Sequence, residues 1–509
     1  MKRRAERWEV LFLTVLFAAG LALRLRLALT TYLNPDEALE ALIAFERGWR
    51  HTFRVALTIP HPPLLLMMVH AISFLGRSEM VVRILPVLAG SLFPLAVYLW
   101  LRRIAGNIAG LFAALLLTFA PHLIGLSAEL RSYTLALFFI AASLAVFEEA
   151  ISTASRGWMW IFNLLLWAAI LSDYTAACFA CAMGVYALLR LGKSPRALKI
   201  DWAAGQAISI AMYGLLFWFQ VRRIESYGMG AEARNGWLSA EFPHRATALL
   251  FPFRNTVDEF RFLMASATLG AMACFLFFAA LWLLWTGRTR IDISISRAIA
   301  ALLILPFLFG IAEAYAGVFP YGGSRHTAII IMFAAMGVAI TLGSLPRRMG
   351  IASLCAAVLL APLWMVYAEP ENNIDPTRNR KELLHQCLDY MHAAIPSGAT
   401  IFTEQETLLI VAFYEGSGVP LRDYSRYLEN SIGGWRVVVH DYDYTTYDQF
   451  AQALAAFRAD YGLRDGDPVW VLDGGWYTVS RPPDPARPFT RAVRVFQSFR
   501  AHDDFEARQ

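Results

Sequence analysis

Two adjacent carboxylates, Asp36 and Glu37, stand where the chain leaves its first long apolar segment. A carboxylate at the rim of a membrane could take a proton from an attacking hydroxyl, or hold an acceptor, where a lipid-linked donor meets a water-soluble partner. The same residues could instead begin a helix, because Asn34-Pro35-Asp36-Glu37 is a good cap with acids in the first turn. Spacing alone leaves both interpretations open.

Further polar residues flank the other apolar segments. The set comprises His61, Glu79, Arg83, Glu129, Arg131, Tyr133, Asp173, Tyr174, Arg325 and His326. Each one alone could be an interfacial anchor, and Glu79 with Arg83 could form an i,i+4 pair on one helix. Together they predict a cluster of mixed charge, suited to a phosphate and a sugar hydroxyl, because arginine binds phosphate through two parallel donors.

The composition places these residues in a membrane protein. Of the 509 residues, 57% are hydrophobic and 17% are charged, and the mean hydropathy is +0.46. A soluble domain would carry more charge. The net charge of +5 does not indicate nucleic acid, because the basic residues fall mainly in short loops between apolar segments. We therefore expect a polytopic α-helical membrane protein.

The cysteines suggest neither a disulfide framework nor a metal site. Cys178, Cys181, Cys274 and Cys355 lie in apolar segments, and Cys387 lies in the polar tail. The CxxC formed by Cys178 and Cys181 falls inside an apolar helical pattern, where packing is the expected role. No cofactor is evident, and a divalent metal requirement stays open, since no His pair has ligand spacing.

The apolar segments predict the membrane topology. A spanning helix needs about 20 mostly apolar residues. By that length we predict about eleven spans, at 8–29, 80–101, 108–125, 132–150, 158–173, 174–191, 202–221, 263–285, 297–318, 327–345 and 350–368. The first is expected to be retained, because it lacks a small-residue cleavage site.

The lysines and arginines predict the orientation. They gather at the N-terminus and in every second loop, so these parts are expected in the cytoplasm. The opposite side then carries residues 30–79, a loop at about 222–262, the stretch "FPYGGSRH" and everything after about 369. We therefore expect a multi-pass protein of the plasma (inner) membrane with an extracytoplasmic C-terminus.

The first outer loop is too long for a simple turn. Its second half, "HPPLLLMMVHAISFLG", is apolar for only about 14 residues, which is short for a span. We predict an interfacial helix there, with Pro62-Pro63 at its start, and another over "EALEALIAFERGW".

The tail differs in composition from the rest. The stretch "KELLHQCLDYMHAAIP" and the stretch "TYDQFAQALAAFRADYGL" have helical spacing, whereas "ATIFTE" and "DPVWVLD" are typical of short buried strands. We therefore predict a transmembrane domain at 1–368 and a small soluble α/β domain at 369–509.

The order of the motifs carries a resemblance. A hydrophobic span is followed by "DE", "HPPL", "SEMVVRILPVLAG", "LSAELRSYTLAL" and "GGSRHT". This order resembles the GT-C superfamily of polyprenyl-phosphate-sugar-dependent glycosyltransferases. Related families are the dolichyl-phosphate-mannose–protein mannosyltransferases, the lipid A aminoarabinose transferase and the rhizobial lipopolysaccharide galacturonosyltransferases. The resemblance covers residues 8–345, roughly two-thirds of the chain.

The resemblance implies roles for individual residues. Asp36 matches the first-loop acid and would be the general base or orient the acceptor, with Glu37 in support. Arg325 matches the late-loop arginine near the lipid phosphate. His61 stands where the aminoarabinose branch has lysine in "KPPL", and His326 stands where many relatives have tyrosine. Both histidines are expected near the donor.

Three more residues, Glu129, Arg131 and Tyr133, match a family-like patch. Arg131 is expected to bind the donor phosphate. Glu129, Tyr133 and Arg83 are expected to position substrate.

The implied reaction is transfer of a sugar from a polyprenyl-phosphate donor to a lipid, glycan or protein acceptor. In the family an acceptor hydroxyl attacks the anomeric carbon, lipid phosphate leaves and the configuration inverts. Such a reaction would serve the cell envelope, through lipopolysaccharide modification or protein glycosylation.

Two other functions compete with this one. A transporter or flippase predicts charges near mid-bilayer and paired broken helices in two related halves. Few acids fall within the spans, and Glu313 is the main exception. A non-catalytic subunit of a glycan assembly machine predicts a degenerate outer cluster, whereas this cluster looks intact.

Overall fold

The structure is a computed structural model. It describes residues 7–226, 229–236, 238–245, 247–289, 291–368, 380–418, 427–440, 447–463, 470–473 and 492–494. Contacts divide the chain into two compact units. The membrane unit comprises 1–26, 53–68 and 83–372, and the C-terminal unit comprises 27–52, 69–82 and 373–509.

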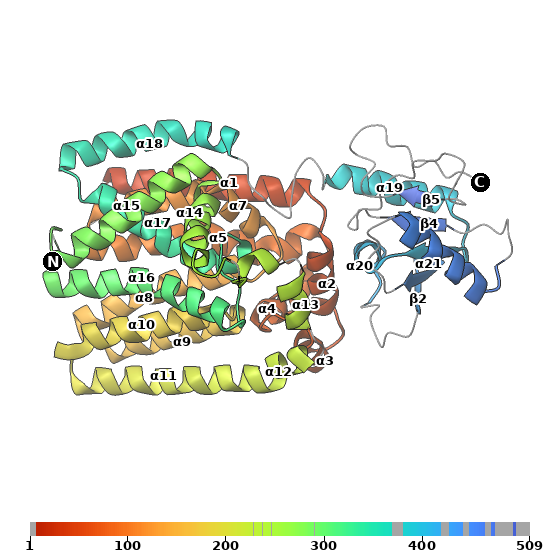
Figure 1. The fold of residues 1–509 in the computed structure, drawn as a ribbon, viewed down its shortest axis with the longest axis horizontal. Helices are drawn as coiled ribbons and strands as arrows, with labels where there is room; N and C mark the ends of the chain where they lie inside the picture. The colour runs from red at the N-terminus through yellow and green to blue at the C-terminus, as the bar shows by residue number, and fades with distance from the viewer. Residues whose placement is uncertain are drawn as a thin grey trace. The chain divides into compact units, whose positions relative to one another are not determined.

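Apolar helices make up most of the membrane unit (Figure 1). They are α1 (Arg7–Thr30), α5 (Glu79–Ile104), α6 (Asn107–Phe119), α7 (Pro121–Ala128), α8 (Tyr133–Thr153), α9 (Arg156–Ser172), α10 (Ala176–Arg190), α11 (Arg196–Leu216), α15 (Ala267–Trp285), α16 (Ile293–Tyr315), α17 (Ala328–Gly343) and α18 (Arg347–Tyr367). Among the described residues, nine helical segments are long and apolar enough to span a membrane, or ten if α6 and α7 count as one. The predicted polytopic helical fold is confirmed.

Two predicted spans differ in form from a single long helix. The helix α9 has only 17 residues. The span predicted at 108–125 is broken between α6 and α7, which meet at 61°. Pro121 explains the break, because proline has no N–H to continue the helix and its ring disfavours a helical residue before it.

A buried arginine stabilises this break. Arg24 of α1 donates from Nη1 to the carbonyl oxygens of Gly20, at 3.1 Å, and Thr118, at 3.2 Å. The Thr118 carbonyl lies in the last turn of α6, where the helix offers no partner. The Arg24 guanidinium therefore supplies the hydrogen-bond donor that the Thr118 carbonyl oxygen would otherwise receive from a continuous helix.

The helix α17 lies at the centre of the membrane unit. Every residue from Ala328 to Ile340 is buried, which is the pattern of a helix surrounded by others. Small residues allow close packing: a Cβ atom on Gly343 would lie 2.6 Å from that of Ala109 on α6. This core fixes the helices whose ends carry the polar residues.

The segment predicted as a loop at 222–262 is largely helical. It contains α12 (Arg222–Ser226), α13 (Met229–Asn235) and α14 (Phe251–Met264). The expected start of the next span at residue 263 was wrong. Ala265 adopts a left-handed conformation, with φ of 46°, and Ser266 then caps α15.

The first loop contains the two predicted helices and a third. These are α2 (Pro35–Ala44), α3 (Trp49–Ala56) and α4 (Leu64–Ile72). Pro62-Pro63 directly precede α4, as expected for residues without a free N–H. Their position at the membrane interface stays a prediction.

The tail is a small mixed α/β fold, as predicted. Its elements are α19 (Lys381–Ala394), β1 (Thr400–Thr403), α20 (Gln405–Tyr414), β2 (Tyr427–Ile432), β3 (Trp435–His440), α21 (Tyr447–Asp460), β4 (Trp470–Asp473) and β5 (Ala492–Arg494). The strand order is β2-β3-β1-β4-β5. All neighbours pair in parallel except β2 and β3, which form an antiparallel hairpin closed by Gly433 and Gly434.

The C-terminal unit is larger than the tail. It includes residues 27–52 and 69–82 of the first loop, and α2 packs against α20. The division of the chain at 368 and 369 into two independent domains stays a prediction.

Candidate active site

The two carboxylates that begin α2 have different environments. Glu37 Oε2 accepts a hydrogen bond from the Asn34 N–H at 3.0 Å, and Asn34 Oδ1 accepts one from the Glu37 N–H at 3.0 Å. This reciprocal pair is a capping box. Glu37 is buried, whereas Asp36 is exposed. The cap therefore involves Glu37 and leaves the Asp36 carboxylate at the surface of its unit.

Four predicted site residues converge in the membrane unit, although they are far apart in the sequence. Arg131 Nη1 lies 3.1 Å from His61 Nε2. The Tyr133 ring stands edge-on to the rings of His61 and His326, with centroids 6.4 and 6.3 Å away. We call His61, Arg131, Tyr133 and His326 the outer cluster. It joins the first loop, the α7–α8 junction and the turn before α17.

Charged residues surround the Tyr133 phenol. Arg325, Arg131, Asp173 and Glu129 all act on it electrostatically. The phenol thus lies within electrostatic reach of two cations and two anions.

Asp173 joins two helix junctions. Its Oδ2 accepts from Ser132 Oγ at 3.2 Å, and its Oδ1 accepts from the N–H of Thr175 at 2.9 Å. Burial raises the pKa of Asp173 above its ordinary value, while the hydrogen bonds from Thr175 and Ser132 oppose the rise. Asp173 therefore holds the start of α8 against the start of α10.

A glutamine that the sequence analysis did not single out holds the His61 segment. Gln220 Nε2 donates to the carbonyl oxygens of Ile59 and His61, both at 2.7 Å, and its Oε1 accepts from Tyr174 Oη at 2.7 Å. The segment around His61 contains three prolines, which limits its own hydrogen bonding. Gln220 lies in a π-helical turn, Phe217–Val221, between α11 and α12. Such turns are frequent at functional sites.

Two glutamates, the partly buried Glu241 and the fully buried Glu259, hold the turn that carries Arg325. Ser324 Oγ donates to Glu241 Oε2 at 2.8 Å, and Thr327 Oγ1 donates to Glu259 Oε2 at 2.9 Å. Ser324 and Thr327 also cap the short 3₁₀ helix Arg325–Thr327. The turn that presents Arg325 is therefore fixed from both sides.

A glycine is required in this turn. Gly323 has φ of 32°, and a Cβ atom there would lie 2.3 Å from the carbonyl oxygen of Asp258. No other residue fits this contact without displacing the backbone of α14.

Burial changes the proton affinity of the two glutamates. It raises the pKa of Glu241 to about 7, against the opposing effects of the Ser324 hydrogen bond and the Arg325 charge. It also raises the pKa of Glu259 well above the ordinary value, and the nearby Glu241 carboxylate adds to that rise. Near neutral pH this pair therefore carries fewer than two negative charges.

The sequence gives little sign of these two glutamates. Glu241 and Glu259 lie in a stretch predicted as a loop, where a carboxylate is ordinarily a solvated side chain. Gln220 is an uncharged residue at the end of an apolar span. Only the acidic residues within an otherwise aromatic stretch, "WLSAEFPH" and "NTVDEFRF", could have drawn attention.

Arg83 is fully buried near the start of α5. Glu79 pairs with Lys381, with Nζ 2.8 Å from Oε2. Cys178 is buried and donates from Sγ to Glu313 Oε2 at 2.9 Å, in keeping with a packing role. Among the described residues, no group of three or more His, Cys, Asp or Glu side chains could hold a metal ion.

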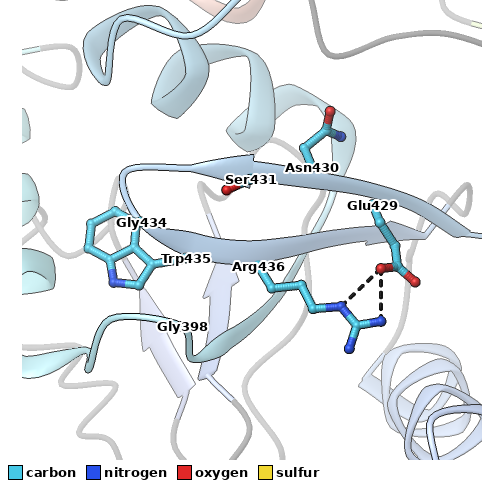
Figure 2. A pocket seen from close by; sticks show the side chains of 7 residues that line it. All are labelled: Gly398, Glu429, Asn430, Ser431, Gly434, Trp435 and Arg436. Carbon is cyan, nitrogen blue, oxygen red and sulfur yellow. Dashed lines mark hydrogen bonds and ion pairs between the residues drawn. The ribbon is translucent and has the colours of Figure 1, made fainter.

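A cavity of about 380 Å³ opens beside the β2–β3 hairpin (Figure 2). The two charged residues of its wall are paired with each other: Arg436 Nε donates to Glu429 Oε2 at 2.9 Å. The Trp435 ring is buried and its N–H donates to the Ile395 carbonyl oxygen at 3.2 Å. The cavity thus offers neither an open aromatic face nor a charge without a partner, and the outer cluster is the better candidate site.

A family model matches part of the chain. Residues 60–218 match the family model PMT_2, dolichyl-phosphate-mannose-protein mannosyltransferase. The predicted resemblance to GT-C superfamily glycosyltransferases is confirmed. The matched region contains His61, Arg131 and Tyr133 of the outer cluster, together with Gln220's partner Tyr174.

Solved structures of glycosyltransferases resemble the chain at low identity. ArnT from Cupriavidus metallidurans, bound to undecaprenyl phosphate, is 16% identical with a TM-score of 0.49, over 82% of this chain and 86% of that chain. The oligosaccharyltransferase of Archaeoglobus fulgidus, tethered with an acceptor peptide, is 14% identical with a TM-score of 0.47. That match covers 80% of this chain and 63% of the oligosaccharyltransferase.

A third solved structure matches over a shorter region. It is the S. cerevisiae protein O-mannosyltransferase Pmt1-Pmt2 complex bound to the sugar donor, at 17% identity and a TM-score of 0.35. The match covers 44% of this chain and 35% of that chain. No curated protein matches the sequence.

Proposed function

We propose that the protein is an inverting glycosyltransferase that moves a sugar from a polyprenyl-phosphate donor to a lipid, glycan or protein acceptor. The reaction would take place at the outer face of the plasma membrane. The observation that carries the proposal is the convergence of His61, Arg131, Tyr133 and His326 from three separate segments, with Arg325 acting on the same tyrosine.

The chemistry of the outer cluster suits a phosphate leaving group. When the bond between the anomeric carbon and the phosphate oxygen breaks, negative charge develops on that oxygen. Arg325 and Arg131 would neutralise it, and fixed cations in a partly dry site stabilise such charge strongly. The buried contacts of Ser324 and Thr327 support this role, because they hold Arg325 in place before substrate arrives.

Asp36 is proposed as the general base. The acceptor hydroxyl would form the new bond to the anomeric carbon from the face opposite the phosphate, and its proton would pass to the Asp36 carboxylate. Asp36 is exposed at the second position of α2, whereas Glu37 is engaged in the helix cap. This difference favours Asp36 over its neighbour as the proton acceptor.

A lipid-linked donor is the proposed sugar source. The family that matches residues 60–218 is described by dolichyl-phosphate-mannose, which is a polyprenyl-phosphate sugar. The predicted outer-face location rests on the charge pattern of the loops. Sugar and acceptor are left open within these classes.

Asp36→Asn tests the proposal. Transfer of label from a polyprenyl-phosphate sugar to membrane glycolipid or protein would be measured in membranes and normalised to the amount of protein. We expect a rate loss of about 10²- to 10⁴-fold, because an amide cannot take the proton.

A matched control separates catalysis from helix stability. Glu382 is also an exposed acid in the first turn of a helix, α19. Glu382→Gln should leave transfer unchanged. If Asp36→Asn behaves like this control, then Asp36 is not the base. If the wild-type protein transfers no sugar from any lipid-linked donor, a non-catalytic subunit or a flippase becomes the better explanation.

A further inference from the structure

The hydroxyl group of Tyr414 joins three segments of the C-terminal unit. It accepts a hydrogen bond from the Leu33 N–H at 3.1 Å and donates one to Glu79 Oε1 at 3.0 Å. The second oxygen of Glu79 accepts from Lys381 Nζ at 2.8 Å. Leu33 and Glu79 are 0% and 5% exposed. The Leu33 N–H and the Glu79 carboxylate are therefore largely shielded from water, whereas the Lys381 side chain, at the far end of this network, is 34% exposed.

Leu33 lies immediately before the start of α2. It directly precedes Asn34, the residue that caps α2, and Asp36 follows two residues after the cap. The cap fixes the helix internally, but it does not fix where the helix begins relative to the rest of the unit. The hydrogen bond that the Leu33 N–H donates to the Tyr414 hydroxyl ties this starting point to α20.

The other end of α2 is held by Phe413, the residue that precedes Tyr414 in α20. Phe45, which ends α2, packs against Phe413 with ring centroids 6.4 Å apart. Arg77 lies over both rings, at 5.1 and 5.6 Å, and donates to the carbonyl oxygens of Gly416 and Ser417 at 3.0 and 2.9 Å. The last turn of α20 thus contacts both ends of α2.

We propose that Tyr414 is a positioning residue for Asp36. Through Leu33 and Glu79 it sets where α2 begins, and so where the Asp36 carboxylate stands when it receives the proton. This inference rests on the proposed role of Asp36 as the base. It gives the C-terminal region a part in the reaction without contact with substrate, because the tail fixes the helix that bears the base.

Tyr414→Phe removes the hydroxyl and keeps the ring that packs against Phe413 and His385. We expect kcat to fall about 10- to 100-fold, the cost of a base displaced by a fraction of an ångström to about 1 Å. The KM for the lipid donor should stay within about twofold, because the donor contacts assigned above belong to other residues. Tyr390→Phe, at a tyrosine that is 50% exposed on α19, is the matched control and should have wild-type kinetics.

A double-mutant cycle separates positioning from general stability. If Tyr414 acts through Asp36, then Tyr414→Phe should cause no further loss in an Asp36→Asn background. A merely structural role predicts the same fractional loss in both backgrounds, and that result would overturn the inference. The proposed function fails by a different result, namely near-normal transfer by Asp36→Asn alone.

Hydrogen exchange gives a readout that does not depend on turnover. In Tyr414→Phe the Leu33 amide should exchange faster, whereas the amides of α18 should be unchanged. If this variant does not fold, Lys381→Gln tests the same network by removing only the ion pair to Glu79. Its kcat should fall about threefold, the effect of a modest hydrogen bond. Unchanged kcat in the folded variants, together with an inactive Asp36→Asn, would refute a role for Tyr414.

Discussion

Arg131 Nη1 and His61 Nε2 lie 3.1 Å apart, within hydrogen-bonding distance. An arginine side chain has only donors, so Nε2 must be the acceptor and the imidazole must be neutral, with its proton on Nδ1. In this contact His61 is therefore the neutral partner, and the positive charge belongs to Arg131.

The role of His61 as a hydrogen-bond acceptor for Arg131 can be tested by two substitutions, one that keeps an acceptor atom and one that removes it. In His61→Gln the amide oxygen can still accept from Arg131, whereas His61→Leu leaves the buried guanidinium without that partner. We expect His61→Leu to lower kcat/KM for the donor about tenfold, as is typical for loss of a hydrogen bond to a charged group, and His61→Gln to lose less. The measurement is donor titration in purified protein. Equal losses in the two variants would show that the ring itself, and not its acceptor nitrogen, is needed.

Glu37 should respond to substitution quite differently from Asp36. Glu37→Gln keeps an oxygen that can accept from the Asn34 N–H, so the capping box survives and activity should stay within about twofold of wild type. Glu37→Ala removes that acceptor and should destabilise the cap by about 1 kcal/mol. Thermal unfolding and transfer would be measured on both variants. A strong loss of transfer in a normally stable Glu37→Gln would reassign the base to Glu37.

Arg325 should separate donor binding from acceptor chemistry. Arg325→Ala is expected to lower kcat/KM for the donor about 10- to 100-fold, because a charge-assisted contact to the phosphate is lost. Arg325→Lys should recover only part, since an ammonium cannot form the two parallel bonds of a guanidinium. Arg254→Ala, at a side chain that is 78% exposed on α14, serves as the control. Full activity in Arg325→Ala would exclude Arg325 from the donor site.

The raised pKa of Glu241 predicts that the free energy of unfolding depends on pH. Its pKa in the folded protein is about 7, above the ordinary value of 4.5. The unfolded chain therefore releases its proton first, and the folded state is penalised increasingly from about pH 4.5 to 7 and uniformly above. Glu241→Gln should match wild-type stability at pH 4 and exceed it above pH 7 by roughly 1 kcal/mol. This is less than the full pKa shift implies, because the carboxylate is only partly buried.

Unfolding temperatures of the two proteins across this pH range would provide the measurement. The glutamine can still accept the hydrogen bond from Ser324, so the turn should be retained. A gain that is the same at pH 4 and pH 8 would contradict the assignment of the shift to burial of this carboxylate. Glu382→Gln should show no change at either pH.

Reporter fusions test the orientation that the loop charges predict. A fusion at about residue 195 should report the cytoplasm, and one at about residue 400 should report the opposite side. Equal signals would show that the number of spans between the two points is even, which contradicts the predicted topology and the outer-face reaction.

The outer cluster could be predicted because its members sit at helix ends. His61, Arg131 and His326 each border an apolar segment, and the loop charges predict that those borders lie on one side. The prediction needed only the number of spans, and not their packing. The helix cap formed by Asn34 and Glu37 could be predicted equally well, because a cap residue followed three positions later by Glu is a local sequence signal.

Gln220, Glu241 and Glu259 could not be found in this way. Their roles depend on which carbonyl or hydroxyl the tertiary fold brings to them, and no local pattern records that. The β2–β3 hairpin is a different case. Gly433 and Gly434 stand between "YLENSI" and "WRVVVH", which is a recognisable two-residue hairpin signal.

The π-helical turn at Phe217–Val221 makes the length of its helix critical. A π-turn accommodates one residue more than an α-helical turn, so it behaves like a one-residue insertion. Deleting a single residue between 217 and 221 would let a regular α-helix close up, with the helices before and after the turn keeping their registers. Only the side chains within the turn would change direction, and the amide of Gln220 would leave the carbonyls of Ile59 and His61. A homologous chain that lacks one residue at this point would therefore be expected to hold its His61 segment with a side chain other than Gln220. This would apply even if the span stayed equally apolar.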